Sequence, residues 1–266
     1  MAASSEHDQA LSEAARIILG SKYVIALVGA GLSVESGIPP FRGPGGLWTK
    51  LGEPDSLGYE RFTQDPKKWW EDRLLGDSRM AGFAEAMEAA KPNPGHHALT
   101  ELEQMGLLRH VITQNVDNLH RVAGSQSLSE IHGNRYRLRC ISCSYRWDQR
   151  ALSLDELPPR CPYCGGLVKS DTVMFGEPIP SDVLATCYEQ AQLSDCVLSI
   201  GTSAQVYPAA QFPVMVKRAG GAIIEVNPYE TAITNWCDIA LRGPSGEALP
   251  ALVQKLRELG GLAGRP

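Results

Sequence analysis

The chain has 266 residues, of which 43% are hydrophobic and 21% charged, and this composition is typical of a folded globular protein. Its formal net charge is -5 at pH 7, so we expect no nucleic-acid partner. We also expect no membrane partner and a cytoplasmic location, because no segment approaches the about 20 apolar residues of a membrane span and the first residues do not resemble a signal peptide.

Hydrophobic patterns predict helices and strands in alternation. Apolar residues recur at helical spacing in residues 7–19, and the apolar run at residues 22–28 is typical of a parallel strand covered on both faces. Comparable runs predict three further strands, at residues 111–113, 196–200 and 222–226. Helical patterns predict the other regular elements, at residues 94–104, 180–193, 208–218 and 246–259. This alternation predicts an α/β fold with a Rossmann-like, doubly wound parallel sheet.

Four of the seven cysteines occur in two Cys-x-x-Cys pairs, Cys140 with Cys143 and Cys161 with Cys164. Their spacing predicts a closed structural site in which four thiolates hold one Zn²⁺ ion, in a reducing compartment. A redox dithiol and a nucleic-acid zinc ribbon are the rival interpretations, which the spacing and the net charge disfavour. We predict that the other cysteines, which have apolar neighbours, are small buried hydrophobic residues: Cys187, Cys196 and Cys237.

Two segments interrupt the alternation of strands and helices. Residues 43–92 are rich in charges and tryptophan and predict a loop followed by a pair of helices, whereas residues 139–169 contain the paired cysteines. We predict that both are insertions and that together they form a small zinc-binding lobe, with 43–92 as its helical part and 139–169 as its zinc ribbon. The Rossmann-like domain would then consist of residues 1–42, 93–138 and 170–266.

Polar or glycine-rich residues follow all four predicted strands. In a doubly wound sheet, ligands bind beyond the carboxyl ends of the strands. Those ends are Gly29-Ala30-Gly31, Gln114-Asn115-Val116-Asp117, Gly201-Thr202-Ser203 and Asn227-Pro228. The sequence therefore predicts one large cleft for a polar ligand at this edge of the sheet.

The first strand end, Gly29-Ala30-Gly31-Leu32-Ser33, is typical of a turn whose backbone amides contact the pyrophosphate of a dinucleotide. The full glycine pattern is not met, because Val34 occupies the position of the third glycine. On this motif alone, a plain strand-to-helix turn remains an alternative.

A glycine-hinged loop with one cation and two aromatic residues follows this turn, at residues 41–48. Arg42 can pair with a phosphate as a planar fork, and Phe41 can shield a reactive carbon from water. The loop can thus close over a ligand. Considered by itself, the segment is also compatible with a surface loop that Trp48 anchors.

His132, which is followed by Gly133, is a candidate general base because an imidazole with a reference pKa of about 6.5 can take a proton near neutrality. It lies between the second polar strand end and the first cysteine pair, and Gly133 leaves room beside it. His120 is the competing candidate. His96 and His97 fall in a predicted helix, where we expect a solvated or packing role.

Eight motifs lie in order along the chain: Gly29-Ala30-Gly31-Leu32-Ser33, Gly37-Ile38-Pro39 with Phe41-Arg42, Thr113-Gln114-Asn115-Val116-Asp117, His132-Gly133, the four paired cysteines, Phe175-Gly176-Glu177, Gly201-Thr202-Ser203 and Val226-Asn227. Their number, order and spacing resemble those of the sirtuins, the NAD-dependent protein deacylases, of prokaryotic type. The resemblance extends over residues 23–249.

This resemblance implies that a Rossmann-like domain and a zinc lobe enclose a cleft, in which an acyl-lysine of a protein or peptide meets the nicotinamide ribose of NAD, the co-substrate. It implies that the acyl oxygen attacks the ribose carbon, that nicotinamide leaves, and that His132 then accepts a proton relayed from the ribose hydroxyls. The products would be free lysine, nicotinamide and an O-acyl-ADP-ribose. We expect the enzyme to be a monomer.

The resemblance also assigns tasks to single residues. Beside His132, the catalytic residues implied are Asp117 for the nicotinamide carboxamide, Asn115 for a ribose hydroxyl or water, and Gln114 as a bridge between the ribose and His132. The NAD contacts implied are Gly29, Ala30, Gly31, Ser33, Phe41, Arg42, Trp48, Gln114, Asn115, Asp117, Gly201, Thr202, Ser203, Asn227 and Ser245. The peptide would bind as an added strand to the backbone of Val173, Phe175 and Gly176.

Substrate choice is where the chain departs from some sirtuins. Members that remove acidic acyl groups such as succinyl carry a Tyr-x-x-Arg pair, and here Arg73 and Gly76 occupy those two positions. We therefore expect a preference for neutral acyl groups, acetyl or longer, with Trp70 or Leu74 lining the acyl pocket. Arg73 as a substrate-binding residue keeps an acidic-acyl preference open.

Two further alternatives concern the reaction itself. Mono-ADP-ribosyl transfer to protein would use NAD and the cleft without an acyl-lysine. A catalytically silent NAD-sensing or zinc-mediated interaction module would keep the glycine turn and the cysteines, but it would not need His132 together with Asn115 and Asp117.

Overall fold

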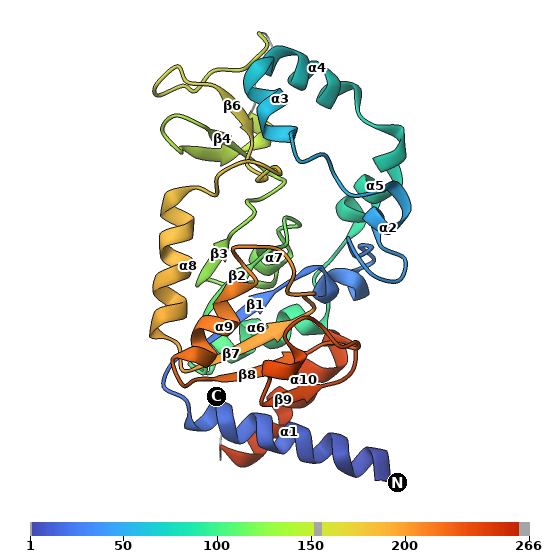
Figure 1. Ribbon diagram of the computed structural model, residues 1–266, viewed down its shortest axis with the longest axis vertical. Helices are drawn as coiled ribbons and strands as arrows, with labels where there is room; N and C mark the ends of the chain where they lie inside the picture. The colour runs from blue at the N-terminus through green and yellow to red at the C-terminus, as the bar shows by residue number, and fades with distance from the viewer. Residues whose placement is uncertain (1, 152–155, 261–266) are drawn as a thin grey trace.

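The computed structural model describes residues 2–151 and 156–260 of the chain, so that small parts of the predicted ranges lie outside the described residues. A six-stranded sheet with the order β3-β2-β1-β7-β8-β9 forms its centre (Figure 1). All five strand pairings in it are parallel. The chain adds strands outward from β1 to one edge and then continues on the other side of β1, which confirms the predicted doubly wound α/β fold.

The strands of this sheet are short and mostly apolar. They are β1 (Val24–Val28), β2 (Leu108–Thr113), β3 (Leu128–Glu130), β7 (Cys196–Ile200), β8 (Ala222–Val226) and β9 (Ile239–Leu241). Every residue of β1 and β7 is buried, because helices cover both faces of the central strands. The apolar runs predict four of the six strands. The other two, β3 and β9, are three-residue edge strands that are too short to give a pattern.

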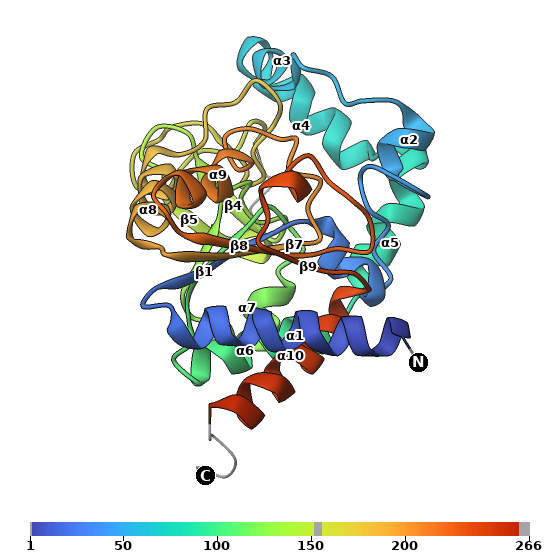
Figure 2. The same cartoon turned by 60° about the horizontal axis from the view of Figure 1, so that its bottom comes forward.

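Two hydrophobic cores lie on opposite faces of this sheet. Side chains of a strand alternate between its faces, so Val24 and Ala26 enter one core whereas Ile25 and Leu27 enter the other. The first core includes α1 (Ala2–Gly20), α6 (Pro94–Gln104) and α10 (Ser245–Leu259), which Figure 2 shows together beneath the sheet. The second includes α8 (Ser181–Leu193) and α9 (Gln211–Arg218).

Local sequence explains where α6 begins. The Asn93 side chain accepts hydrogen bonds from the amides of Gly95 and His96, at 2.9 and 3.4 Å, and Pro94 occupies the first helical position. Asn93 also donates to the Leu32 carbonyl oxygen at 2.7 Å. The helix start is therefore fixed against η1 (Ala30–Ser36), the 3₁₀ helix that follows β1.

The segment predicted as a loop and a pair of helices is more finely divided. It contains α2 (Leu47–Leu51), α3 (Gly58–Gln64), α4 (Pro66–Leu75), η2 (Ser78–Met80) and α5 (Ala81–Ala89). Gly52 ends α2 and Gly76 ends α4, each with a positive φ that favours glycine. Figure 1 shows these helices running along one side of the molecule, from the main sheet to a small lobe at the top.

A second, antiparallel sheet forms that small lobe. Its strands are β4 (Arg137–Cys140), β5 (Arg146–Asp148) and β6 (Val168–Ser170), in the order β5-β4-β6, and η3 (Gln149–Ala151) follows β5. Trp70 of α4 packs into the lobe and donates from Nε1 to the Val168 carbonyl oxygen at 2.8 Å. Both inserted segments thus contribute to one lobe, as predicted, while the residue boundaries assigned above remain a prediction.

Two further short elements are α7 (Leu119–Ala123), which follows β2 in the sequence, and η4 (Thr234–Trp236), which precedes β9. Cys187 and Cys196 are fully buried, and Cys237 is partly buried. No helix of residues 2–151 and 156–260 is both long and apolar enough to cross a membrane.

Candidate active site

A cleft of about 1180 Å³ opens between the carboxyl ends of the main strands and the small lobe. Most residues that the motifs single out line it, and they come from segments far apart in the sequence. These are Gly29, Ala30, Gly31, Phe41, Arg42, Trp48, Gln114, Asn115, His132, Val173, Phe175, Gly176, Gly201, Thr202, Ser203, Asn227 and Ser245. The strand ends therefore face a common space.

The turn after β1 packs directly against the turn after β7. The Gly29 amide donates to the Ile200 carbonyl oxygen at 2.9 Å, and the Gly31 amide donates to the Gly201 carbonyl oxygen at 2.8 Å. A Cβ atom on Gly31 would lie 2.6 Å from the Gly201 Cα atom, which no real side chain tolerates. Glycine is therefore required here for two backbones to meet at the floor of the cleft, between the strands where the sheet order reverses.

The position of Val34 in the structure shows why this chain does not need the third glycine of a dinucleotide-binding turn. In the full pattern, that glycine permits close packing of the following helix on the strand. Val34 is 44% exposed and lines the cleft instead of packing between η1 and the sheet. A side chain at this position therefore meets no neighbouring backbone.

A chain of buried hydrogen bonds lies behind this turn. The Asn115 Nδ2 atom donates to the Gly29 carbonyl oxygen and to Ser33 Oγ, at 3.1 Å each, and Ser33 Oγ donates to Asp117 Oδ2 at 2.6 Å. Asp117 also accepts from the Leu119 amide at 2.9 Å. Burial raises the pKa of Asp117. Of these residues, Asn115 lines the cleft, whereas Ser33 and Asp117 lie just behind its lining.

His132 has a defined tautomer. Its Nδ1 atom lies 3.2 Å from the carbonyl oxygen of Gln114, and because a carbonyl oxygen can only accept, Nδ1 carries the hydrogen. The other ring nitrogen, Nε2, is therefore free to accept a proton. Burial lowers the pKa of His132, and the bond to Gln114 partly opposes this. The imidazole is thus neutral near pH 7, as a general base requires.

His120, the competing candidate, does not reach the cleft. It is 2% exposed and packs edge to face against His96, with ring centroids 5.2 Å apart. Neither of its ring nitrogens has a hydrogen-bond partner among the described residues. Burial lowers the pKa of His120 to about 4.

The glycine-hinged loop forms one wall of the cleft. The Arg42 guanidinium lies 4.4 Å from the centre of the Trp48 ring and pairs with Glu53 through an Nη2–Oε2 contact of 2.9 Å. The Trp48 ring contacts Phe41, at 4.9 Å between centroids, and Phe175, at 5.5 Å. Trp48 therefore connects the loop to the segment at residues 173–176 on the lobe side.

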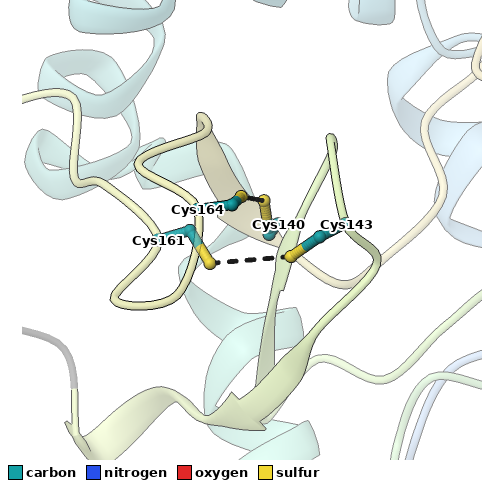
Figure 3. A group of neighbouring side chains, drawn as sticks. All are labelled: Cys140, Cys143, Cys161 and Cys164. Atoms are coloured by element: carbon teal, nitrogen blue, oxygen red, sulfur yellow. Dashed lines mark hydrogen bonds between the residues drawn. The ribbon is translucent and has the colours of Figure 1, made fainter.

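The side chains of the four paired cysteines point toward one another, as Figure 3 shows. Their Sγ atoms all lie within 4.8 Å of one another, with Cys140 3.5 Å from Cys164 and Cys143 3.7 Å from Cys161. A tetrahedral Zn²⁺ ion with bonds of about 2.3 Å to sulfur requires sulfur–sulfur distances of about 3.8 Å. The donor set therefore fits one structural Zn²⁺ ion, as the spacing predicts.

Three residues that were predicted for the acyl pocket lie outside the cleft lining. Trp70 is 2% exposed in the core of the small lobe, and Leu74 is 50% exposed on its surface. Arg73 places its guanidinium over the Trp69 ring, 5.5 Å from the centroid. Helix α4 faces the lobe and solvent rather than the cleft, which a sequence pattern cannot reveal.

Several lining residues escape the motifs: Glu35, Ile179, Leu184, Tyr207 and Tyr229. Tyr207 and Tyr229 follow strand-end motifs by a few residues. Their closeness in sequence to those strand ends could have predicted that they line the cleft. Ile179 precedes α8 and Leu184 lies in its first turn, and neither carries such a signal.

Comparison with known proteins identifies the family. The Sir2 family model matches residues 29–208. The NAD-dependent protein deacylase of Pyrococcus abyssi (strain GE5 / Orsay) is 46% identical over 252 residues, which cover 93% of this chain and 98% of the relative.

Two solved structures have the same fold. A Sir2 homologue in complex with NAD has a TM-score of 0.77 and 41% identity, covering 93% of this chain and 94% of its own. A Sir2 protein bound to a myristoylated histone peptide has a TM-score of 0.69 and 33% identity, and the match covers 96% of this chain and 99% of that protein. With a glycine-rich cleft, a neutral imidazole and a four-cysteine site in place, the chain belongs to the Sir2 family, the sirtuins, and is an NAD-dependent protein deacylase.

Proposed function

We propose that this enzyme removes neutral acyl groups, acetyl foremost, from lysine side chains of proteins and releases nicotinamide and an O-acyl-ADP-ribose. The observation that carries the proposal is the imidazole of His132, whose Nδ1 hydrogen points to the Gln114 carbonyl oxygen while Nε2 remains free beside the cleft. NAD, when bound, supplies an electrophilic ribose carbon. His132 Nε2 then accepts the proton that a ribose hydroxyl loses.

The cofactor contacts follow from the cleft lining. The amides of Gly29 and Gly31 are already bonded to the end of β7 and the turn after it. The glycine turn at residues 29–31 and the Thr202 and Ser203 side chains would therefore line the phosphate site, and Asn227 with Ser245 would line the adenosine end. Thr202 Oγ1 accepts from Gln114 Nε2 at 2.9 Å, which orients the Gln114 amide toward the ribose. The remaining contacts proposed are Ala30, Ser33, Phe41, Arg42, Trp48, Asn115, Asp117 and Gly201.

Two of these contacts need a small rearrangement. Asp117 and Ser33 lie behind Asn115, so a nicotinamide carboxamide would reach Asp117 only after the Ser33–Asp117 hydrogen bond opens. Arg42 is likewise engaged by Glu53, and a phosphate would compete with that carboxylate.

The acyl-lysine peptide would bind along residues 173–176. The Val173 amide already donates to the His132 carbonyl oxygen at 2.8 Å, and the Tyr59 amide donates to the Phe175 carbonyl oxygen at 3.3 Å. No hydrogen bond among the described residues uses the Val173 carbonyl oxygen or the Phe175 amide. These groups are available to a peptide strand beside His132. A related Sir2 protein has been solved with a myristoylated histone peptide, which supports an acylated peptide as the ligand.

Charge in the cleft favours a neutral acyl group. Among the described residues that line it, Arg42 is the one arginine or lysine, and the loop places it at the proposed phosphate end. Glu35 and Glu230 also line the cleft, and no arginine or lysine among the described residues pairs with either carboxylate, so both would disfavour a succinyl group. With Arg73 outside the lining, no other described cation there offers a partner for a distal carboxylate.

One experiment tests this preference. We expect kcat/KM to be higher for acetyl-lysine and butyryl-lysine versions of one peptide than for its succinyl-lysine version. Faster removal of succinyl would contradict the proposal. Mass-tagged ADP-ribose on protein, without deacylation of the peptide, would instead favour mono-ADP-ribosyl transfer.

We further propose that the enzyme acts in the cytoplasm as a monomer and without nucleic acid. Seven free cysteines favour a reducing compartment, and the net charge of -5 disfavours nucleic acid. Light scattering at micromolar concentration is expected to give the mass of one chain, 28.8 kDa. A mass of twice that value would contradict the monomer.

A further inference from the structure

A cluster of six charged side chains lies behind the proposed peptide segment. Its members alternate in sign and connect β4, β5, β6 and α8 with residues 173–177: Arg139, Arg146, Lys169, Asp171, Glu177 and Asp182. Four of these side chains are 6% exposed or less, namely those of Arg139, Lys169, Asp171 and Glu177. A buried ion cluster contributes little net stability. Because this cluster lies behind one wall of the cleft, we consider instead which backbone segments of that wall it orients.

Glu177 is the hub of this cluster. One carboxylate oxygen pairs with Arg139, and the other accepts from Lys169 Nζ at 3.0 Å and from the Met174 amide at 2.8 Å. The Glu177 amide in turn donates to the Met174 carbonyl oxygen at 3.0 Å. Met174 is therefore held by both the backbone and the side chain of Glu177, within the segment proposed to bind the peptide.

Lys169 and Asp171 fix the approach to that segment. Lys169 Nζ donates to the carbonyl oxygens of Ser170 and Thr172 at 2.7 and 2.8 Å, so that with Glu177 its three hydrogens are used. Asp171 accepts from Arg139 Nε at 3.0 Å and from the Asn134 amide at 3.2 Å. Asn134 follows His132 by two residues, so the cluster joins the loop of the general base to the peptide segment.

A second buried carboxylate, Glu225 of β8, also pairs with an arginine behind residues that line the cleft. Glu225 is 1% exposed and accepts from Arg242 Nη1 at 2.6 Å and from Thr234 Oγ1 at 2.8 Å. Arg242 Nη1 also donates to the carbonyl oxygens of Asn227 and Tyr229, at 3.2 and 3.0 Å. This pair holds the turn at residues 227–229, which lines the end of the cleft proposed for adenosine.

We propose that Glu177 and Glu225 are positioning residues for different ligands, Glu177 for the acyl-lysine peptide and Glu225 for the adenosine part of NAD. Neither side chain is assigned to touch a reacting atom. Each carboxylate holds, through an arginine or directly, the backbone that the ligand contacts. This inference rests on the proposed function, because that function assigns the peptide and adenosine ends of the cleft.

Crossed binding measurements on the zinc-loaded full chain test the proposal. Glu177→Gln and Glu225→Gln keep side-chain shape but remove the charge. We expect Glu177→Gln to raise the Kd of a fluorescent acetyl-lysine peptide about tenfold or more, with the Kd of ADP-ribose changed less than about twofold. Glu225→Gln is expected to give the reverse pattern. Asp182→Asn, at the exposed end of the cluster, is the matched control and should change neither Kd.

Equal weakening of both ligands by each variant, or no change in either, would overturn the proposal, because a merely structural role does not discriminate between ligands. If Glu177→Gln does not fold, Lys169→Met serves instead and should raise only the peptide Kd. Zinc content and thermal midpoint are measured for every variant. If the wild type binds both ligands but does not remove the acyl group, the proposed function is contradicted. The Kd values of the two variants for peptide and ADP-ribose would still test the positioning roles of Glu177 and Glu225.

Discussion

Acid is expected to destabilise the protein through two buried histidines. His96 and His120 are 0% and 2% exposed, and burial lowers the pKa of His96 to about 3 and that of His120 to about 4. The unfolded chain binds these protons with a pKa of about 6.5, so the unfolded state takes up more protons as the pH falls below that value. The stability from the neutral pair is therefore present above about pH 6.5 and is lost progressively as the pH falls, toward pH 4 for His120 and toward pH 3 for His96.

The magnitude follows from these pKa values. Between pH 7 and pH 5, each histidine removes about 2 kcal/mol from the free energy of unfolding, and the pair removes about 4 kcal/mol. That loss is a large part of the about 5–15 kcal/mol that stabilises a typical domain. His120 lies in α7, which directly follows the polar strand end at residues 114–117, so we expect loss of activity to follow.

Urea unfolding of the zinc-loaded protein at pH 7 and pH 5 measures this effect. His120→Leu removes one titrating ring from the pair, and the loss of unfolding free energy between the two pH values should shrink by about 2 kcal/mol. His97→Leu is the matched control, because His97 is exposed on the same helix as His96 and should leave the loss unchanged. An identical pH dependence in the wild type and His120→Leu would refute the reasoning.

Two further perturbations test the architecture of the cleft and the lobe. Gly31→Ala would place a Cβ atom 2.6 Å from the Gly201 Cα atom, so the two turns must separate. Calorimetry should then show the Kd of NAD raised about tenfold or more. A Kd equal to that of the wild type would show that the close contact between the turns is not needed. Removal of zinc should open the lobe in which Trp70 packs against Cys140 and Val168, and it should change tryptophan fluorescence and abolish deacylation until zinc is restored. Full activity with less than one tenth of an equivalent of zinc would contradict a structural role for the metal.

The predicted architecture came from features that are local in the sequence. The run before Gly29 had to be a covered parallel strand because no polar residue interrupts it, and both of its faces are indeed buried. The zinc site was predictable because Cys-x-x-Cys spacing reflects the reach of a metal to two neighbouring thiolates. Edge strands such as β3 were missed because three residues give no periodicity.

Features that depend on packing between distant segments were beyond a sequence pattern. The family resemblance implied that Asp117 and Ser33 contact NAD, but only the fold places them behind Asn115. Arg73 shares a helix with Trp70, and the burial of Trp70 in the lobe directs that helix away from the cleft. The pairing of Glu177 with Arg139 joins residues 38 positions apart and had no local signal.

The central claim is that His132 is the general base of an NAD-dependent deacylation. Its most direct test compares wild type and His132→Ala in a steady-state assay with NAD and an acetyl-lysine peptide, which measures nicotinamide and O-acetyl-ADP-ribose. We predict that the substitution lowers kcat/KM by about 10²- to 10⁴-fold while the Kd of NAD remains close to that of the wild type. Nicotinamide release at the wild-type rate, in the presence of the peptide, would contradict the assignment.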